Sequence, residues 1–130
     1  MRLLLDTHVA VWLSAQPSLV PIGIKKLIAD PANEIFVSSV SIFEIAVKRR
    51  TGRRDAPPIS AAEASRNFEA SGYQFLQVTP KHAATVETLT FHHKDPFDHL
   101  LIAQAVAEPM HLISNDAAIA LYDCPRIPWE

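Results

Sequence analysis

Short apolar runs alternate along this sequence with longer segments of helical length. The strand-like runs lie at residues 2–5, 35–37, 75–78 and 111–114, with a last short one near 126–127. Strands separated by such segments need crossover connections, which favour a parallel sheet with helices on both of its faces. The sequence therefore predicts the α/β class, with a mostly parallel central sheet and the first strand in a central position.

Capping and helix-breaking residues delimit the helices that we expect. These helices are predicted at 7–15, 19–29, 40–50, 61–71, 80–89, 97–107 and 117–121. Thr79-Pro80 and Asp95-Pro96 each place a cap before a first-turn proline, and Ser60 and Glu63 have the spacing of a capping box. Because no linker or repeat interrupts this pattern, we expect a single domain over residues 1–130.

Composition limits the classes of protein that this chain can represent. Its 130 residues suit one domain, and 48% hydrophobic with 20% charged residues is ordinary globular usage. The formal charge of −2 means that any contact with nucleic acid must be local.

The single Cys124 cannot form an intrachain disulfide, and the spacings of a structural zinc site are absent. Because Asp6 and His8 interrupt the apolar N-terminus and no membrane span is present, we expect a cytoplasmic protein.

Two carboxylates stand where folding would bury a charge. Asp6 directly follows the first apolar run, and Glu44 lies within another apolar stretch. Burying an ionised carboxylate is costly unless it is paired, protonated or bound to a cation. Asp6 can alternatively cap a helix, and Glu44 can pair with Lys48 one helical turn later. On the predicted helix Lys48 and Ser41 lie toward the polar face, whereas Glu44 lies at the core boundary, which favours a position lining a crevice.

Two further carboxylates are expected near the first two. Asp98 shares the buried stripe of its helix, whereas Asp95 is expected to cap that helix. Asp116 follows the fourth strand as Asp6 follows the first, and the carboxyl ends of parallel strands form the usual ligand crevice. Either residue alone can be a cap. Together with Glu44 they would form a cluster of like charges that needs a cation, and oxygen ligands suit Mg²⁺ or Mn²⁺, which indicates metal-assisted phosphodiester chemistry.

Four segments of the chain, taken in order, resemble the PIN-domain ribonucleases. They are Leu3-Leu4-Leu5-Asp6-Thr7-His8, Ser41-Ile42-Phe43-Glu44-Ile45, the run from Asp95 to Ala105, and Ile113-Ser114-Asn115-Asp116. More narrowly, the chain is similar to the VapC-type toxins of type II toxin–antitoxin systems. The resemblance implies the PIN fold, a three-layer α/β/α sandwich. It also implies a metal-dependent endoribonuclease, usually a homodimer, that a cognate antitoxin inhibits.

The resemblance also assigns roles to residues. The family's four acidic positions are filled by Asp6, Glu44, Asp98 and Asp116. Asp6, Asp98 and Asp116 would bind the Mg²⁺ or Mn²⁺, and Glu44 would orient or deprotonate the attacking water. Thr7 and Ser114 match hydroxyl positions that support the site. His99 stands where the family usually has Arg, a departure that bears on substrate contacts.

A basic cluster directly follows the predicted helix that carries Glu44. It contains Lys48, Arg49, Arg50, Arg53 and Arg54. These side chains are candidates for contacts with RNA phosphates, and the alternative is a solvated helix end whose cations complement the helix dipole. The segment His92-His93-Lys94 is a weaker candidate, because histidines are largely neutral at pH 7 and no metal spacing links them. Trp12 and Trp129 are expected to be packing residues.

Other readings of the sequence fit less well. Aspartyl-phosphate phosphatases also begin with a strand ending in Asp, but they need a second Asp where this chain has His8. A dinucleotide-binding enzyme is disfavoured because the chain has three glycines and no G-x-G-x-x-G motif. The remaining alternative is a catalytically inactive scaffold that binds RNA or protein. The presence of all four acidic residues favours the enzyme.

Overall fold

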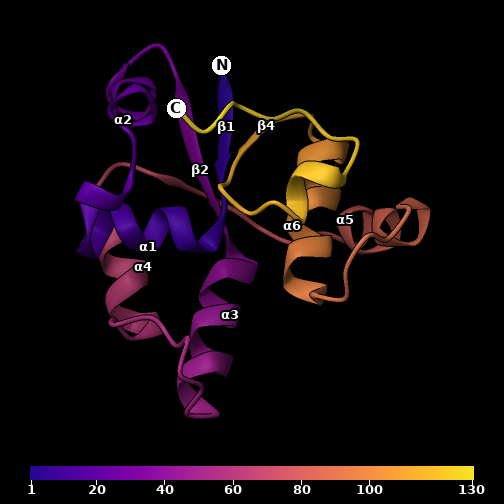
Figure 1. The fold of residues 1–130 in the computed structure, drawn as a ribbon, viewed down its shortest axis with the longest axis horizontal. Helices are drawn as coiled ribbons and strands as arrows, with labels where there is room; N and C mark the ends of the chain where they lie inside the picture. Colours follow the sequence, from indigo (N-terminus) through magenta and orange to yellow (C-terminus); the bar gives the residue numbers. More distant parts are fainter.

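The computed structural model describes residues 1–130, and at its centre is a four-stranded parallel sheet (Figure 1). The strands are β1 (Arg2–Leu5), β2 (Glu34–Ser38), β3 (Gln74–Leu76) and β4 (His111–Ile113). Their spatial order is β3-β2-β1-β4, and each neighbouring pair is parallel. The chain thus winds outward from β1 to β3 and returns to the other side of β1 as β4. The central position predicted for the first strand is confirmed.

Helices connect the strands, and most of them begin and end at the predicted signals. They are α1 (Thr7–Ala15), α2 (Ile22–Ala29), α3 (Ser39–Arg50), α4 (Ala61–Ala70), α5 (Pro80–Thr85) and α6 (Pro96–Ala107). Ser60 and Glu63 form the capping box of α4, and Asp95 accepts hydrogen bonds from the first backbone N–H groups of α6. Gly52 and Gly72 follow α3 and α4 with φ of 66° and 83°, the left-handed conformation that favours glycine after a helix.

Several predicted boundaries are wrong. The helix predicted from residue 19 begins at Ile22, because Pro17–Leu19 form a 3-10 turn instead. The helix predicted over 80–89 ends at Thr85 and continues only as a 3-10 turn, and 117–121 likewise holds just a 3-10 turn. The last predicted strand is reduced to one bridge between Arg126 and Leu112. Prolines at 125 and 128 flank that bridge, and proline cannot donate to a strand ladder.

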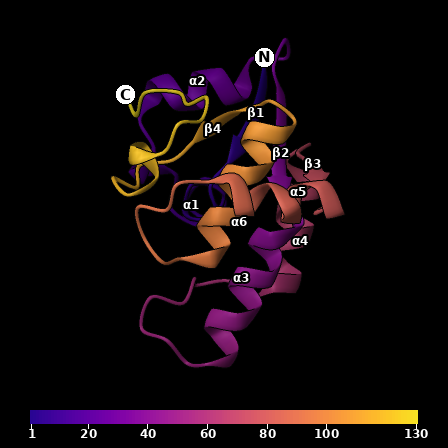
Figure 2. The ribbon, with the colours of Figure 1, turned by 90° about the vertical axis from the view of Figure 1, so that its right-hand side faces the viewer.

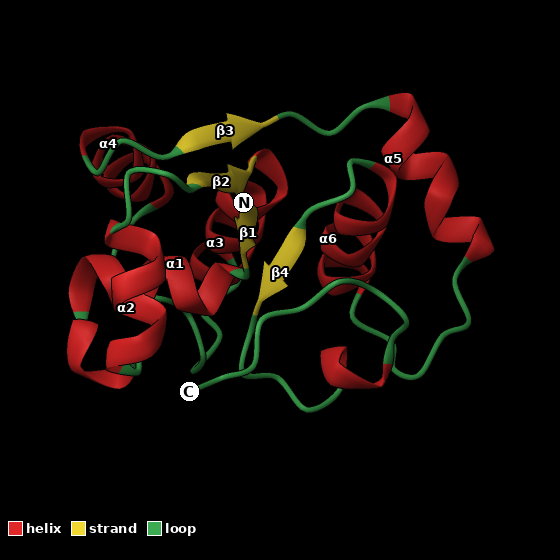
Figure 3. Cartoon of the chain, turned by 90° about the horizontal axis from the view of Figure 1, so that it is seen from above, coloured by secondary structure: helices red, strands yellow, loops and turns green.

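The sheet separates two hydrophobic clusters, since successive side chains of a strand point to opposite faces. Leu3 and Leu5 of β1 pack in a cluster with residues of α1, α2 and α4, whereas Leu4 packs with residues of α6. Figure 3 shows α1, α2 and α4 on one side of the strands and α5 and α6 on the other. The predicted three-layer α/β/α sandwich is therefore confirmed. Trp12 and Trp129 pack against the first cluster, with ring centroids 6.1 Å apart, as expected.

Helices begin at the carboxyl edge of the sheet, where the strands end. α1 begins directly after β1, and α3 begins directly after β2. Figure 2 shows α3 extending away from the strands on the side opposite the N-terminus, with α5 and α6 in front of the sheet. No helix in the structure combines the length and apolar character needed to cross a bilayer.

Candidate active site

The site begins where β1 and β4 end side by side. The Asp6 carboxylate makes no capping hydrogen bond to α1, so a capping role for this side chain is excluded. Instead the Ser114 hydroxyl, which follows β4, donates to Asp6 Oδ2 at 2.7 Å. The strand order reverses between β1 and β4, and in open α/β sheets ligands bind at such a point.

Glu44 lies on α3, buried with 2% of its surface exposed. Thr7 Oγ1 donates to Glu44 Oε1 at 2.8 Å and also lies 2.8 Å from Ser41 Oγ. The second oxygen, Oε2, lies 2.7 Å from the Lys48 ammonium. Each oxygen of this carboxylate therefore has its own partner, one a hydroxyl and one a cation. Thr7 thus contacts a predicted site carboxylate, as Ser114 does.

Lys48 is buried, and its predicted place on the polar face of the helix is wrong, as is that of Ser41. The chain beyond α3 explains the difference, because it folds back beside Lys48 and brings Asp55 to 3.6 Å from the ammonium. Burial alone lowers the pKa of Lys48, but the hydrogen bond and charge of Glu44, with the charges of Asp55 and Asp95, raise the pKa above its ordinary value. The pairing of Glu44 with Lys48 thus forms, as a buried ion pair.

Asp98 lies in the first turn of α6 with 6% of its surface exposed, so its predicted inward orientation is confirmed. Its Oδ2 is 2.9 Å from His93 Nε2, and no lysine or arginine pairs with it. Burial raises the pKa of Asp98 to about 8, with further upward contributions from the charges of Asp6, Asp95, Glu44 and Asp116. The charges of the other three predicted carboxylates therefore reach Asp98.

Burial also raises the pKa of Asp6, although the hydrogen bond from Ser114 and the charge of His8 act in the opposite direction. Asp116 is half-buried beyond β4 and forms a turn in which its Oδ1 accepts from the Ala118 N–H at 2.8 Å. The backbone N–H of Asp116 donates to Ser114 Oγ at 3.0 Å. Ser114 therefore links the Asp6 carboxylate to the segment that carries Asp116.

The donor set fits a hard divalent cation. Asp6, Asp98 and Asp116 offer carboxylate oxygens, the ligand type that Mg²⁺ and Mn²⁺ prefer, and Asp98 is a buried acid with no cationic side chain beside it. No group of three or more Asp, Glu, His or Cys side chains in the structure lies close enough together to hold a metal ion. Mg²⁺ usually keeps several waters and takes only one or two protein carboxylates, so a site for it does not require three direct protein ligands.

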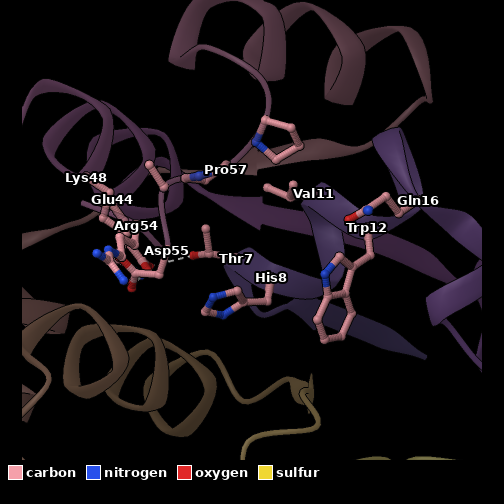
Figure 4. Close-up of a pocket in the computed structure, with 12 residues that line it drawn as sticks. Thr7, His8, Val11, Trp12, Gln16, Glu44, Lys48, Arg54, Asp55 and Pro57 are labelled. Carbon is pink, nitrogen blue, oxygen red and sulfur yellow. Dashed lines mark hydrogen bonds and ion pairs between the residues drawn. The ribbon is translucent and has the colours of Figure 1, made fainter. Parts of the chain in front are cut away.

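A cavity of about 190 Å³ opens beside Glu44 (Figure 4). It lies between α1, the end of α3 and the loop over 54–58. Figure 4 shows Lys48, Arg54 and Asp55 near Glu44, and Trp12 and Gln16 at the far end. The three predicted metal ligands do not line this cavity. It therefore approaches the site from the Glu44 side.

The basic cluster does not act as one surface. Lys48 belongs to the buried pair and is not the exposed phosphate contact that we expected. Arg49 donates to the Pro57 carbonyl, and Arg53 makes two hydrogen bonds of 3.0 Å to the Asp55 carboxylate. Arg50 and Arg54 are exposed, and Arg54 lines the cavity beside Glu44. Contacts with RNA remain a prediction for the four arginines.

Two residues near Asp98 are not predicted as part of the site. His93, a weak candidate by its sequence because no metal spacing surrounds it, bonds to Asp98, and Tyr122 bonds to His93. Neither carries a signal in the sequence, because these contacts depend on how the loop before α6 folds. His99 is buried, stacks on Phe91 with centroids 4.1 Å apart and bonds to the His93 carbonyl. His99 therefore holds that loop in place, and the expected effect of this departure on substrate contacts remains a prediction.

Comparisons with known proteins found similar sequences and similar folds. The family model described as PIN domain matches residues 3–123. Ribonuclease VapC22 of Mycobacterium tuberculosis is 29% identical over 126 residues, covering 95% of this chain and 93% of that protein. Among solved structures, VapBC2 from Rickettsia felis bound to a promoter DNA fragment matches with a TM-score of 0.70 at 15% identity, over 100% of both chains. VapBC-1 from nontypeable Haemophilus influenzae matches with a TM-score of 0.63 at 14% identity, over 99% and 98% of the chains.

Proposed function

The chain belongs to the PIN domain family, and from this premise we propose that it is a metal-dependent endoribonuclease, the toxin of a type II toxin–antitoxin pair. One observation carries the proposal: Asp98 is buried with no lysine or arginine paired to it, and the charges of Asp6, Asp95, Glu44 and Asp116 add to burial in raising its pKa to about 8. A cation supplied from outside would relieve that repulsion, and RNA phosphate oxygens can share it. The similarity to a protein named a ribonuclease supports RNA as the substrate class.

The site residues would have different roles in hydrolysis. Asp6, Asp98 and Asp116 would hold Mg²⁺ or Mn²⁺, which when bound polarises a phosphate and lowers the pKa of water. Glu44 would orient the attacking water or take its proton. Thr7 and Lys48 hold the two Glu44 oxygens in place for that step. Attack by water leaves a 5′-phosphate and a 3′-hydroxyl on the cut RNA.

Partners follow from the same proposal. Two of the matched structures are titled as VapBC complexes, which supports a cognate antitoxin as the partner that inhibits this chain. We also propose that the protein is a homodimer and acts in the cytoplasm, where its RNA substrate is found. Light scattering of the purified chain measures the first of these directly, and the mass of a monomer would contradict it.

RNA cleavage with and without a chelator tests the proposed function. The wild type should cut RNA to 5′-phosphate ends in Mg²⁺ or Mn²⁺ and lose that activity in chelator. Asp6→Ala should slow cleavage by about 10³-fold, since metal assistance contributes several kcal/mol and each tenfold in rate is 1.36 kcal/mol. Glu69→Gln, which alters an exposed carboxylate of α4, is the matched control and should cleave normally. RNA binding without cleavage by the wild type would instead identify an inactive scaffold.

A further inference from the structure

The Tyr122 hydroxyl makes three contacts with one short segment of the loop before α6. It lies 2.9 Å from the backbone nitrogen of His92 and 3.3 Å from that of His93. It also lies 2.8 Å from the ring nitrogen Nδ1 of His93. Tyr122 is buried, and its ring packs edge-on against the rings of both histidines. This hydroxyl therefore fixes the position of the His93 ring.

Counting protons decides which way these hydrogen bonds run. A tyrosine hydroxyl has one proton to donate and two lone pairs to accept with. The backbone N–H groups of His92 and His93 can only donate, so they occupy the lone pairs of Tyr122. The Tyr122 proton must then be donated to His93 Nδ1, which acts as the acceptor. With Nδ1 accepting, the His93 ring donates through Nε2.

That Nε2 proton points at the proposed metal site. His93 Nε2 lies 2.9 Å from Asp98 Oδ2, to which it donates. Asp98 Oδ1 has no hydrogen-bond partner among the side chains, so the two oxygens of this carboxylate are distinct. His99 secures the same arrangement from the other side, because its Nε2 bonds to the His93 carbonyl at 2.8 Å.

We propose that Tyr122 and His93 are positioning residues for Asp98, acting as a relay in which Tyr122 sets the tautomer of His93 and His93 orients the carboxylate. Occupying Oδ2 with an N–H donor leaves Oδ1 for a divalent cation. Outer hydrogen-bond partners of metal-binding groups typically change metal affinity or activity by 10- to 100-fold. The inference rests on the proposed function of the four carboxylates and extends it to two residues outside them.

Calorimetric titration of Mn²⁺ into the metal-free chain, beside RNA cleavage at saturating Mn²⁺, tests the relay. Tyr122→Phe keeps the ring but removes the hydroxyl, and it should weaken Mn²⁺ binding by about tenfold. His93→Phe should weaken it at least as much. The double variant should bind Mn²⁺ no more weakly than His93→Phe alone, because Tyr122 acts only through His93. Tyr73→Phe, which removes a hydroxyl outside the site, should bind Mn²⁺ like the wild type.

Other outcomes would overturn the relay. Unchanged Mn²⁺ affinity in Tyr122→Phe would do so, and so would losses that multiply in the double variant. If His93→Phe fails to fold, His93→Gln replaces it, since the amide N–H can take the place of Nε2–H. That variant should respond to Tyr122→Phe less than the wild type does, and an equal response would contradict the relay. A wild type that neither binds Mn²⁺ nor cleaves RNA would instead refute the proposed function.

Discussion

Glu44 and Asp98 are both buried carboxylates of the candidate site, but only Glu44 has a cationic side chain that balances its charge. Glu44 has a cation on one oxygen and a hydroxyl on the other, at 2.7 Å and 2.8 Å. Asp98 has only the His93 ring beside one oxygen, and its pKa is raised to about 8, first by burial and then by the charges of other carboxylates. The charge of Glu44 is therefore balanced within the chain, whereas that of Asp98 is left to be balanced from outside.

This difference assigns the two sides of the site to different tasks. A carboxylate that already has Lys48 beside it is poorly suited to ligate a metal through both oxygens, but it is held in place to orient water. A carboxylate surrounded by others of its kind gains most from a divalent cation. Variants that alter one side and leave the other intact test the comparison.

The largest expected effect on stability comes from neutralising Glu44. Glu44→Gln leaves Lys48 buried with only the more distant Asp55, and removing one partner of a buried ion pair costs about 3–5 kcal/mol. Urea unfolding of the metal-free chain should show a loss near the lower end of that range, with Glu69→Gln unchanged. A Glu44→Gln variant as stable as the wild type would show that the Lys48 charge does not depend on Glu44 for its balance.

A variant that also changes Lys48 tests whether charge causes this loss of stability. Adding Lys48→Met to Glu44→Gln removes the stranded cation, and replacing a buried ion pair with uncharged residues of similar volume is often neutral. The double variant should regain most of the stability that Glu44→Gln loses. If the two substitutions instead destabilise additively, packing around α3 rather than charge explains the loss.

Metal should stabilise the fold through Asp98. At a Mn²⁺ concentration 100 times the dissociation constant, binding to the folded state alone adds about 2.7 kcal/mol. Thermal unfolding with and without Mn²⁺ should show this gain in the wild type and not in Asp98→Asn. An equal gain in both proteins would place the cation elsewhere.

Without metal, the same substitution should act in the other direction from Glu44→Gln. Asp98→Asn removes a group whose pKa rises to about 8 on folding and keeps an oxygen that can accept from His93. That rise opposes folding at every pH above the ordinary pKa of Asp, so in chelator at pH 8 the variant should be more stable than the wild type by more than about 1.4 kcal/mol, the free energy of one pKa unit. The gain should shrink as the pH falls toward 4. A loss of stability would mean that the Asp98 charge is compensated after all.

The smallest effect concerns substrate on the Glu44 side. Arg54 is exposed and lines the cavity beside Glu44, so it is the member of the basic cluster best placed to contact a phosphate. Arg54→Ala should weaken RNA binding and reduce the slope of log affinity against log salt by about 0.7. Arg66→Ala, an exposed arginine of α4, should leave that slope unchanged. The same slope in Arg54→Ala and the wild type would favour a solvated helix end.

Local patterns predicted most of the fold and the burial of Asp6, Glu44 and Asp98. An apolar run that stops at Asp6 predicts strand β1 and the polar residue after it. Asp95-Pro96 predicts the start of α6 from two adjacent residues alone. Asp98 could be placed inward because its spacing matches the buried face of one helix. In each case the deciding interactions lie within a few residues.

Predictions failed where contacts distant in the sequence decide the structure. Lys48 is buried because a loop folds beside it, and helical periodicity alone placed it on the polar face. His93 reaches Asp98 in a geometry that Tyr122 fixes from 29 residues away, a contact that no local spacing encodes. The C-terminal bridge through Arg126 is equally nonlocal, and prolines keep it from becoming a strand.

The rate of RNA cleavage against Mn²⁺ concentration, in the wild type and in Asp98→Asn, tests the central claim most directly. If Asp98 holds the cation, the wild-type rate should rise to saturation with Mn²⁺ and fall to background in chelator. The rate of Asp98→Asn should stay near background at every Mn²⁺ concentration. Cleavage by Asp98→Asn at the wild-type rate, or wild-type cleavage that persists in chelator, would contradict it.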